Sequence, residues 1–228
     1  MCSVTEERFQ AGGKEISLYI SDKRDCPLIV LNTFEGGGAQ VLAEARKMGG
    51  GDFSLLSVGG LDWNRDMSPW ECAPVMAQDE GYAGGADAYL SLLLEEILPE
   101  GLKRLPESPS WTGIAGYSLA GLFALWAAYQ TDRFAGIVAA SPSVWYRDWL
   151  TYAGGHDIRT PRVYLSLGDR EEKARNPVMA SVGHAIRAQY RMLAEAGIHS
   201  QLDWNPGNHF ADSDRRMARG MAWICGAQ

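Results

Sequence analysis

Positive charge, long apolar segments and a secretory start are all lacking in this sequence. Its 21 Lys and Arg residues face 28 Asp and Glu, giving a net charge of −7, and no basic run is longer than a pair. Nucleic acid and anionic membranes are therefore not expected partners. No segment is apolar for long enough to span a bilayer, and residues 1–8 are polar and acidic. We therefore expect a cytoplasmic protein with no membrane association.

Paired cysteines are also lacking. The sequence has four cysteines, Cys2, Cys26, Cys72 and Cys225. They form no C-x-x-C pair, and no histidine lies at ligand spacing from any of them. We expect free thiols in a reducing compartment, no structural zinc or other metal, and no cofactor. The glycine triplet at residues 36–38 lacks the Gly-Lys-Ser/Thr ending of a phosphate loop, so it is expected to let the backbone approach a ligand.

What the sequence does contain is an alternation of apolar runs and helical spacings. Strands are expected at residues 14–20, 27–32, 52–58, 111–117, 134–140, 162–167 and 200–204, and helices at 41–48, 86–98, 119–129, 178–196 and 213–224. Residues 14–20 are expected to pair with the segment around Arg8 as an antiparallel edge, and Pro99 and Gly101 to weaken any continuation of the 86–98 helix. The pattern predicts an α/β fold, with a mostly parallel central sheet and helices on both faces. The length suits a single domain, residues 1–228.

One stretch predicts a strand, a sharp turn and a helix, with Ser118 at the turn. Small residues stand two positions before and two positions after the serine, at Gly116 and Ala120. Small residues are needed there when the serine adopts a strained positive φ, because strand and helix then pass closely. This is the setting of an enzyme nucleophile; a serine that merely caps a helix is the alternative from this stretch alone.

A nucleophilic serine needs a histidine base and an acid that orients the histidine. In α/β-hydrolases these residues follow the serine in the order acid, histidine, each after a strand. His209 follows the last expected strand, whereas His156, His184 and His199 are expected to be solvated or packed histidines. Three acids follow the 162–167 strand. We favour Glu171, the third residue after Gly168, over Asp169 and Glu172.

Backbone and aromatic groups complete the predicted site. Oxyanion donors are expected from the N–H of Leu119 and from the N–H of either Thr33 or Phe34. Several aromatic residues lie on loops that follow strand C-terminal ends, where open α/β sheets bind ligands. Those expected to bind substrate are Trp63, Trp70, Trp145 and Tyr146.

Taken together, these stretches resemble the putative-esterase family of α/β-hydrolases, which includes enterochelin esterases, S-formylglutathione hydrolases, feruloyl esterases and mycolyltransferases. Residues 116–125, GYSLAGLFAL, are similar to the family's G-x-S-x-G-G-x-x-A-L, and residues 66–69, DMSP, to its D-[LFY]-[ST]-P. GGADAY at 84–89 with EEILP at 95–99 resembles G-G-A-D-x-F…E-E-L-I-P, and SPS at 141–143 and GNH at 207–209 complete the likeness. The resemblance covers most of the chain from Pro27 onward.

The resemblance implies a serine carboxylesterase that acts on a compact acyl or aryl ester, its small-molecule partner. Two departures bear on this: Ala120 replaces the second elbow glycine, and Trp63 stands where siderophore esterases often have an arginine. A siderophore trilactone esterase and a non-catalytic binding member of the fold are the alternatives. Formation of a homo-oligomer stays open at this point, as does acyl transfer in place of hydrolysis.

Overall fold

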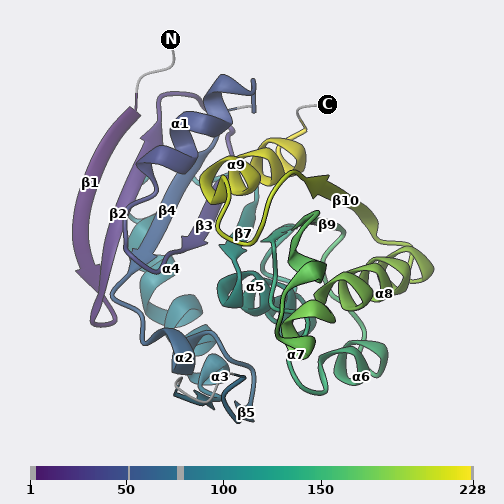
Figure 1. Cartoon of the computed structure of the whole chain (residues 1–228). Coiled ribbons are helices and arrows are strands. Elements are labelled where there is room, and N and C mark those ends of the chain that lie inside the picture. Colours follow the sequence, from purple (N-terminus) through teal and green to yellow (C-terminus); the bar gives the residue numbers. More distant parts are fainter. Residues whose placement is uncertain (1–3, 51, 76–79, 227–228) are drawn as a thin grey trace.

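The computed structural model describes residues 4–50, 52–75 and 80–226, and its centre is an eight-stranded sheet. The strand order is β1-β2-β4-β3-β7-β8-β9-β10 (Figure 1). The strands are β1 Val4–Ala11, β2 Lys14–Ser21, β3 Leu28–Asn32, β4 Ser54–Gly59, β7 Thr112–Tyr117, β8 Gly136–Ala140, β9 Arg162–Gly168 and β10 His199–Asn205. All seven expected strands are present, and β1 adds the antiparallel edge expected around Arg8.

Most neighbouring strands of the sheet run parallel. From β4 to β10 every neighbouring pair runs parallel, and only β1 with β2 and β2 with β4 are antiparallel. Every residue of β3, β4 and β8 is buried, as required of strands covered on both faces. The α/β-hydrolase fold expected from the sequence is therefore confirmed.

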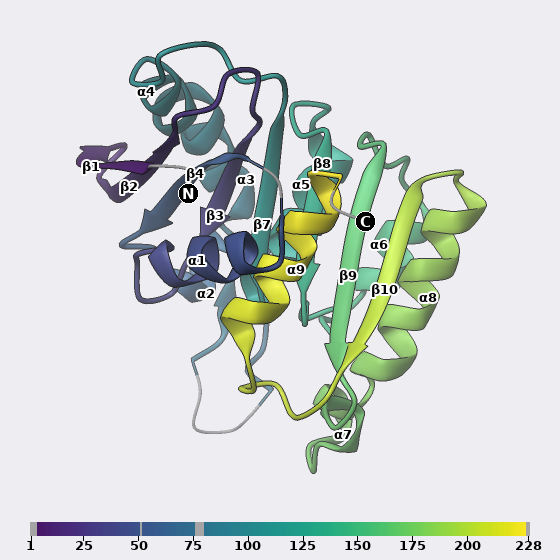
Figure 2. The same cartoon turned by 90° about the horizontal axis from the view of Figure 1, so that it is seen from above.

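Helices cover the two faces of the sheet in separate groups. On one face α1 Ala39–Lys47 and α9 Ser213–Ile224 lie side by side (Figure 2), and their apolar residues pack with Tyr164 and Phe53. On the other face α3 Ala86–Leu92, α5 Leu119–Gln130, α6 Trp149–Gly154 and α8 Val182–Glu195 share a second apolar cluster. The sheet is thus a central layer between two layers of helices.

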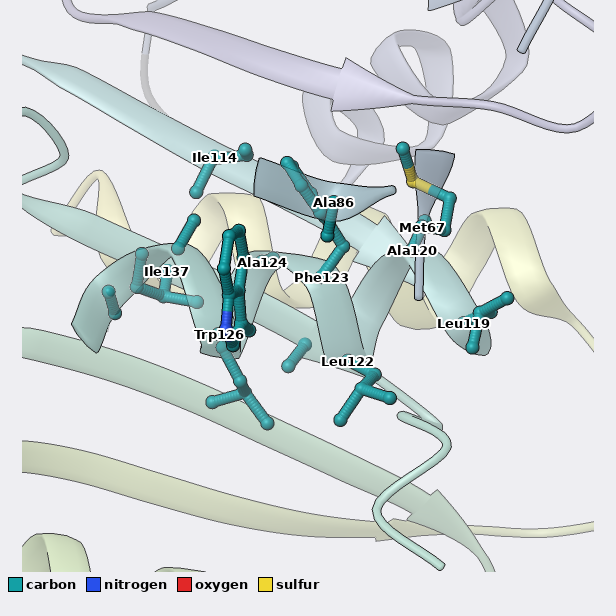
Figure 3. Close-up of a cluster of buried hydrophobic side chains, with 14 of the residues drawn as sticks. Met67, Ala86, Ile114, Leu119, Ala120, Leu122, Phe123, Ala124, Trp126 and Ile137 are labelled. Atoms are coloured by element: carbon teal, nitrogen blue, oxygen red, sulfur yellow. The ribbon is translucent and has the colours of Figure 1, made fainter. Parts of the chain in front are cut away.

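Helix α5 is buried almost all round, because its residues from Leu119 to Tyr129 are all buried. Figure 3 shows apolar side chains of this helix in one cluster with Ile114 and Ile137 of the sheet and Ala86 of α3. A helix held on several sides has a fixed first turn. The residue just before that turn is Ser118.

The structure corrects three expectations about the helices. The helix expected at 86–98 is longer than expected. After α3 it passes through a π-helical segment, Leu93–Ile97, and continues as α4 Leu98–Leu102, which contains Pro99 and Gly101. Pro99 is tolerated because it stands in the first turn of α4, and the bare Gly101 lets the helix pack against Leu56. The predicted 178–196 helix is divided into α7 Pro177–Ala180 and α8, and α6 was not expected.

Short elements and loops complete the described chain. They are α2 Trp63–Asp66, a small hairpin of β5 Glu71–Cys72 and β6 Tyr82–Ala83, and a 3-10 turn Glu171–Lys173. Within the described ranges no helix is long and apolar enough to cross a membrane, and no group of three or more His, Cys, Asp or Glu could hold a metal ion. Cys26, Cys72 and Cys225 are free thiols, and Cys2 lies outside the described residues.

Candidate active site

Ser118 stands at a strained turn between β7 and α5. Its φ is +58° and its ψ is −121°, a conformation that is unfavourable for a residue with a side chain. The turn is held by backbone bonds: the Ser118 N–H donates to the carbonyl of Ala140 at 3.1 Å, and its carbonyl accepts from the Ser143 N–H at 3.0 Å. A Cβ on Gly116 would collide with the carbonyl of Ala120. The close approach therefore needs glycine at 116, while the methyl group of Ala120 fits in the buried turn.

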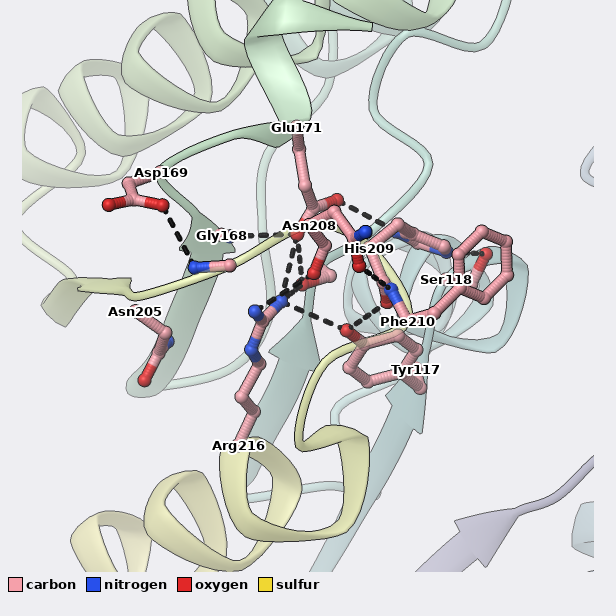
Figure 4. Close-up of polar contacts among 12 residues, drawn as sticks. Tyr117, Ser118, Gly168, Asp169, Glu171, Asn205, Asn208, His209, Phe210 and Arg216 are labelled. Atoms are coloured by element: carbon pink, nitrogen blue, oxygen red, sulfur yellow. Dashed lines mark hydrogen bonds and ion pairs between the residues drawn. The ribbon is translucent and has the colours of Figure 1, made fainter.

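The structure brings Ser118, His209 and Glu171 into one hydrogen-bonded line (Figure 4). The Ser118 Oγ lies 3.0 Å from His209 Nε2, and His209 Nδ1 lies 2.7 Å from Glu171 Oε2. An ionised carboxylate only accepts, so Nδ1 carries the proton and Nε2 is free to accept the serine hydroxyl proton. The three residues come from the ends of β7, β10 and β9, which lie at the same edge of the sheet because these strands are parallel.

The other two candidate acids point elsewhere. Asp169 is exposed and its carboxylate accepts the backbone N–H of Gly207 at 2.9 Å. Glu172 pairs with Arg187 of α8 at 2.8 Å. Of the three, Glu171 alone is buried and contacts His209.

Glu171 is surrounded by hydrogen-bond donors. Its Oε1 accepts from Ser141 Oγ at 2.7 Å, from the Gly168 N–H at 2.7 Å and from Arg216 Nη1 at 2.9 Å, while Oε2 faces His209. Burial raises the pKa of the Glu171 carboxyl, but the hydrogen bond and charge of His209 and the bonds from Ser141 and Gly168 outweigh burial, so its pKa is lowered overall. The carboxylate is therefore ionised at neutral pH.

Arg216 of α9 belongs to the site although the sequence did not point to it. Its side chain is 1% exposed and makes five hydrogen bonds, to the oxygens of Tyr117, Ser141, Glu171, Pro206 and Asn208. A signal existed in the sequence. Arginine stands on the face of the 213–224 helix that also carries the buried Gly220 and Ile224, where an apolar residue is the norm.

Two backbone N–H groups, those of Leu119 and Phe34, are candidates for oxyanion donors. Leu119 is the first residue of α5, so its N–H has no acceptor within the helix. The Thr33 N–H donates to the Val58 carbonyl at 3.0 Å and is therefore occupied in the sheet. Phe34 follows it in the loop that borders the cavity at Ser118, so Phe34 is the better candidate of the two.

Two cavities meet at Ser118 and share His209, Phe210 and Trp63 in their walls. The first, of about 620 Å³, extends over the β3 loop and is bordered by the acidic residues Glu35 and Asp214. The second, of about 570 Å³, extends toward α7 and is bordered by basic residues, namely Arg170, Lys173 and Arg175. Trp63 contacts Phe34 edge to face, with 5.3 Å between ring centroids.

The predicted aromatic residues divide into two groups. Trp63 and Trp145 border the cavities at Ser118. Trp70 and Tyr146 do not: the Tyr146 hydroxyl donates to the Trp70 carbonyl at 2.6 Å, and the Tyr146 ring packs on the Trp70 ring, which itself packs against α6. Trp70 thus covers apolar surface of α6, a helix that the sequence did not predict, and contact of either ring with substrate stays a prediction. Phe210, 88% exposed, and Tyr82 border the second cavity instead.

The remaining histidines lie away from this site. His156 is exposed and stacks on Tyr152 at 4.1 Å, and His184 is exposed on α8. His199 begins β10, at the opposite end of that strand, beside Trp223.

A family model described as "Putative esterase" matches residues 57–213, more than half of the chain. The chain belongs to this esterase family. As a member of it, the protein is a carboxylesterase of the α/β-hydrolase fold.

Solved structures with the same fold come from several esterases. An IroE-like serine hydrolase from Shewanella oneidensis matches with a TM-score of 0.78 and 15% identity over 97% of this chain and 80% of the other. A siderophore hydrolase, EstB from Aspergillus nidulans, matches with a TM-score of 0.73 and 18% identity over 97% and 94%. A structure described as ferulic acid esterase matches with a TM-score of 0.68 and 14% identity over 100% and 99%. At these identities the likeness shows the shared fold.

Proposed function

We propose that this esterase hydrolyses compact acyl or aryl esters through a triad of Ser118, His209 and Glu171. The observation that carries the proposal is the line of hydrogen bonds from Ser118 Oγ through His209 to Glu171, with links of 3.0 and 2.7 Å. These are the distances that proton transfer in a serine hydrolase requires. The partner is a small-molecule ester, and the proposed location is the cytoplasm.

The first half-reaction acylates the serine. His209 Nε2 takes the hydroxyl proton while Oγ forms a bond to the ester carbonyl carbon, and the carbonyl π electrons move to its oxygen. The N–H groups of Leu119 and Phe34 stabilise that oxyanion. When the tetrahedral intermediate collapses, the bond to the alcohol oxygen breaks and His209 returns the proton to the departing oxygen.

The second half-reaction releases the acid. A water molecule attacks the acyl-serine, gives its proton to His209 Nε2, and the Oγ–carbon bond breaks as the serine recovers that proton. Throughout, the Glu171 carboxylate holds the Nδ1–H and stabilises the positive charge that develops on the imidazole. Its lowered pKa keeps the carboxylate ionised for this role.

Exposed aromatic rings around the serine support an aryl or acyl group as the recognised part of the substrate. Phe34 and Phe210 are 69% and 88% exposed, and with Trp63 they border the cavities at Ser118. An apolar ligand that covers such exposed rings removes apolar surface from water, which favours binding. A solved structure of the same fold is described as a ferulic acid esterase, which agrees with an aryl ester.

A siderophore trilactone is the second candidate. The three basic residues of the second cavity favour an anionic catecholate, and one structural relative is described as a siderophore hydrolase. Arg175→Glu should then lower kcat/KM for a catecholate trilactone several-fold at low salt but leave a neutral aryl ester unchanged. Arg133→Glu, which changes an exposed residue near the opposite end of the sheet, is the matched control.

The test of the triad is Ser118→Ala assayed on p-nitrophenyl acetate. We expect a loss of about a thousandfold or more in kcat, with the far-ultraviolet circular dichroism of the wild type. Ser108→Ala is the control, since Ser108 is exposed and borders neither cavity at Ser118. Equal activity of Ser118→Ala and wild type would refute the proposed triad.

A further inference from the structure

Arg216 links the two loops that carry His209 and Glu171. Its Nη2 donates to the carbonyls of Pro206 and Asn208, at 3.1 and 3.0 Å, in the loop just before His209. Its Nη1 donates to Glu171 Oε1 at 2.9 Å (Figure 4). The planar guanidinium thus holds the base-carrying loop and the acid at a fixed separation, which a single ammonium group could not do.

A second route from Arg216 reaches the histidine backbone. Arg216 Nη1 lies 3.1 Å from the Tyr117 hydroxyl, which in turn donates to the carbonyl of His209 at 2.7 Å. Tyr117 directly precedes Ser118. The same guanidinium is therefore linked, through the Tyr117 side chain, to the backbone of His209 and to the residue before Ser118.

The contact with Glu171 leaves the catalytic face of the acid free. Arg216 bonds to Oε1, whereas His209 bonds to Oε2. Both side chains of the pair are almost completely buried, with exposures of 1% for Arg216 and 5% for Glu171. A buried carboxylate that loses its cation is strongly destabilised, so Arg216 also favours the ionised acid.

Arg216 does not touch substrate, because it borders neither of the cavities at Ser118. Any effect on turnover must pass through Glu171 and the histidine loop. Resting on the proposed function, we propose that Arg216 is a positioning residue that sets the distance and charge of the acid–histidine pair. This role goes beyond holding the fold, and it predicts changes in kcat and in pH dependence with little change in KM.

The groups that face Glu171 determine the expected pH effect. They are His209 after β10, Ser141 after β8, Gly168 at the end of β9, and Arg216 on α9, with Tyr117 of β7 nearby. Burial raises the pKa of Tyr117, so it stays neutral in the assay range. Removing the guanidinium takes a buried positive charge away from Glu171 Oε1, which should favour the protonated form of the acid.

Arg216→Gln is the direct test, measured on p-nitrophenyl acetate. We expect kcat to fall about a hundredfold with KM within about twofold, as a displaced catalytic group would cause. The acid limb of the kcat/KM profile should move up by about one pH unit or more. Arg216→Lys should restore the acid limb and recover part of kcat, because it keeps the charge but cannot hold both loops.

Arg219→Gln is the matched control. Arg219 lies one turn later on the same helix and donates to Asn205 Oδ1 at 2.9 Å, without contact to Glu171. Its kcat and pH profile should equal those of the wild type. If Arg216→Gln does not fold, Arg216→Lys alone decides: a kcat reduced about tenfold at unchanged KM supports the proposal.

Wild-type kcat and an unmoved acid limb in folded Arg216→Gln would overturn the inference, as would wild-type kcat in Arg216→Lys. The rate of labelling by a fluorophosphonate separates this failure from failure of the triad. If the wild type is labelled at Ser118 and Arg216→Gln is labelled equally fast, only the role of Arg216 is wrong. If the wild type is not labelled at all, the proposed function itself fails.

Discussion

The two sides of Ser118 are built in contrasting ways. Behind the serine, the part-buried hydrogen bonds of His209 lead to Glu171, whose own hydrogen bonds to Arg216 and Ser141 are buried. In front of it, the cavity walls carry exposed rings such as Phe34 and Phe210. The buried side fixes atoms in place, as proton transfer requires, whereas the exposed side offers apolar area that a ligand can cover. Changes behind the serine should therefore reduce kcat for every ester, and changes in front should alter which ester is preferred.

The largest effect is expected from Glu171→Gln, on the buried side. The amide keeps the shape of the carboxyl but cannot favour the Nδ1–H tautomer or stabilise the imidazolium, so kcat should fall about a thousandfold or more on all esters. The measurement is steady-state kinetics on an acetyl and a feruloyl ester. Asp169→Asn and Glu172→Gln are the matched controls and should stay within about twofold, since neither acid contacts His209. An equal loss in Asp169→Asn would show that the acid has been assigned to the wrong residue.

Acid should weaken the buried side of the site before it affects the aromatic side. The pKa of Glu171 is lowered from its ordinary value of 4.5, so the stability that its carboxylate contributes is present above that value. It is lost as pH falls through the lower pKa of the folded protein. In urea unfolding from pH 6 to pH 3, the wild type should lose free energy of unfolding more steeply below 4.5 than Glu171→Gln. Parallel curves for the two proteins would contradict this account.

A smaller and selective effect is expected from the aromatic side. Phe210→Ala and Trp145→Ala should each lower kcat/KM for a feruloyl ester about three- to tenfold and leave acetyl ester hydrolysis nearly unchanged, because one aromatic contact contributes about 0.5–1.5 kcal/mol. Trp204→Ala is the control, as Trp204 is also exposed but borders neither cavity at Ser118. Equal losses on both esters would show that these rings support the catalytic geometry and do not select the substrate.

Trp70 and Tyr146 sharpen the same contrast. The Trp70 ring packs on Trp149 of α6, and its carbonyl accepts from Tyr146. Trp70→Ala should therefore lower the midpoint of thermal unfolding by several degrees without changing the ratio of feruloyl to acetyl activity. Thermal melts and the two-ester assay measure these quantities. A changed ester ratio in a protein of unaltered stability would place Trp70 at the substrate after all.

Much of the architecture can be predicted from the sequence, because buried parallel strands and an elbow serine leave strong local patterns. Chain order is enough to name Ser118 and His209, and the position three residues after Gly168 favours Glu171 among three neighbouring acids. Local patterns fail where a distant element decides. The place of Trp70 depends on α6, on which its ring packs, and the loss of Thr33 as a donor depends on its bond to β4. Arg216 was missed because its partners come from the ends of four different strands.

The central claim is that the buried network makes Ser118 a nucleophile. The most direct measurement is the rate of covalent labelling by a fluorophosphonate, with the modified peptide identified by mass spectrometry. We expect fast labelling at Ser118 in the wild type, none in Ser118→Ala, and labelling slowed about a hundredfold or more in His209→Ala. Folded wild-type protein that is not labelled at Ser118, or His209→Ala labelled as fast as the wild type, would contradict the account.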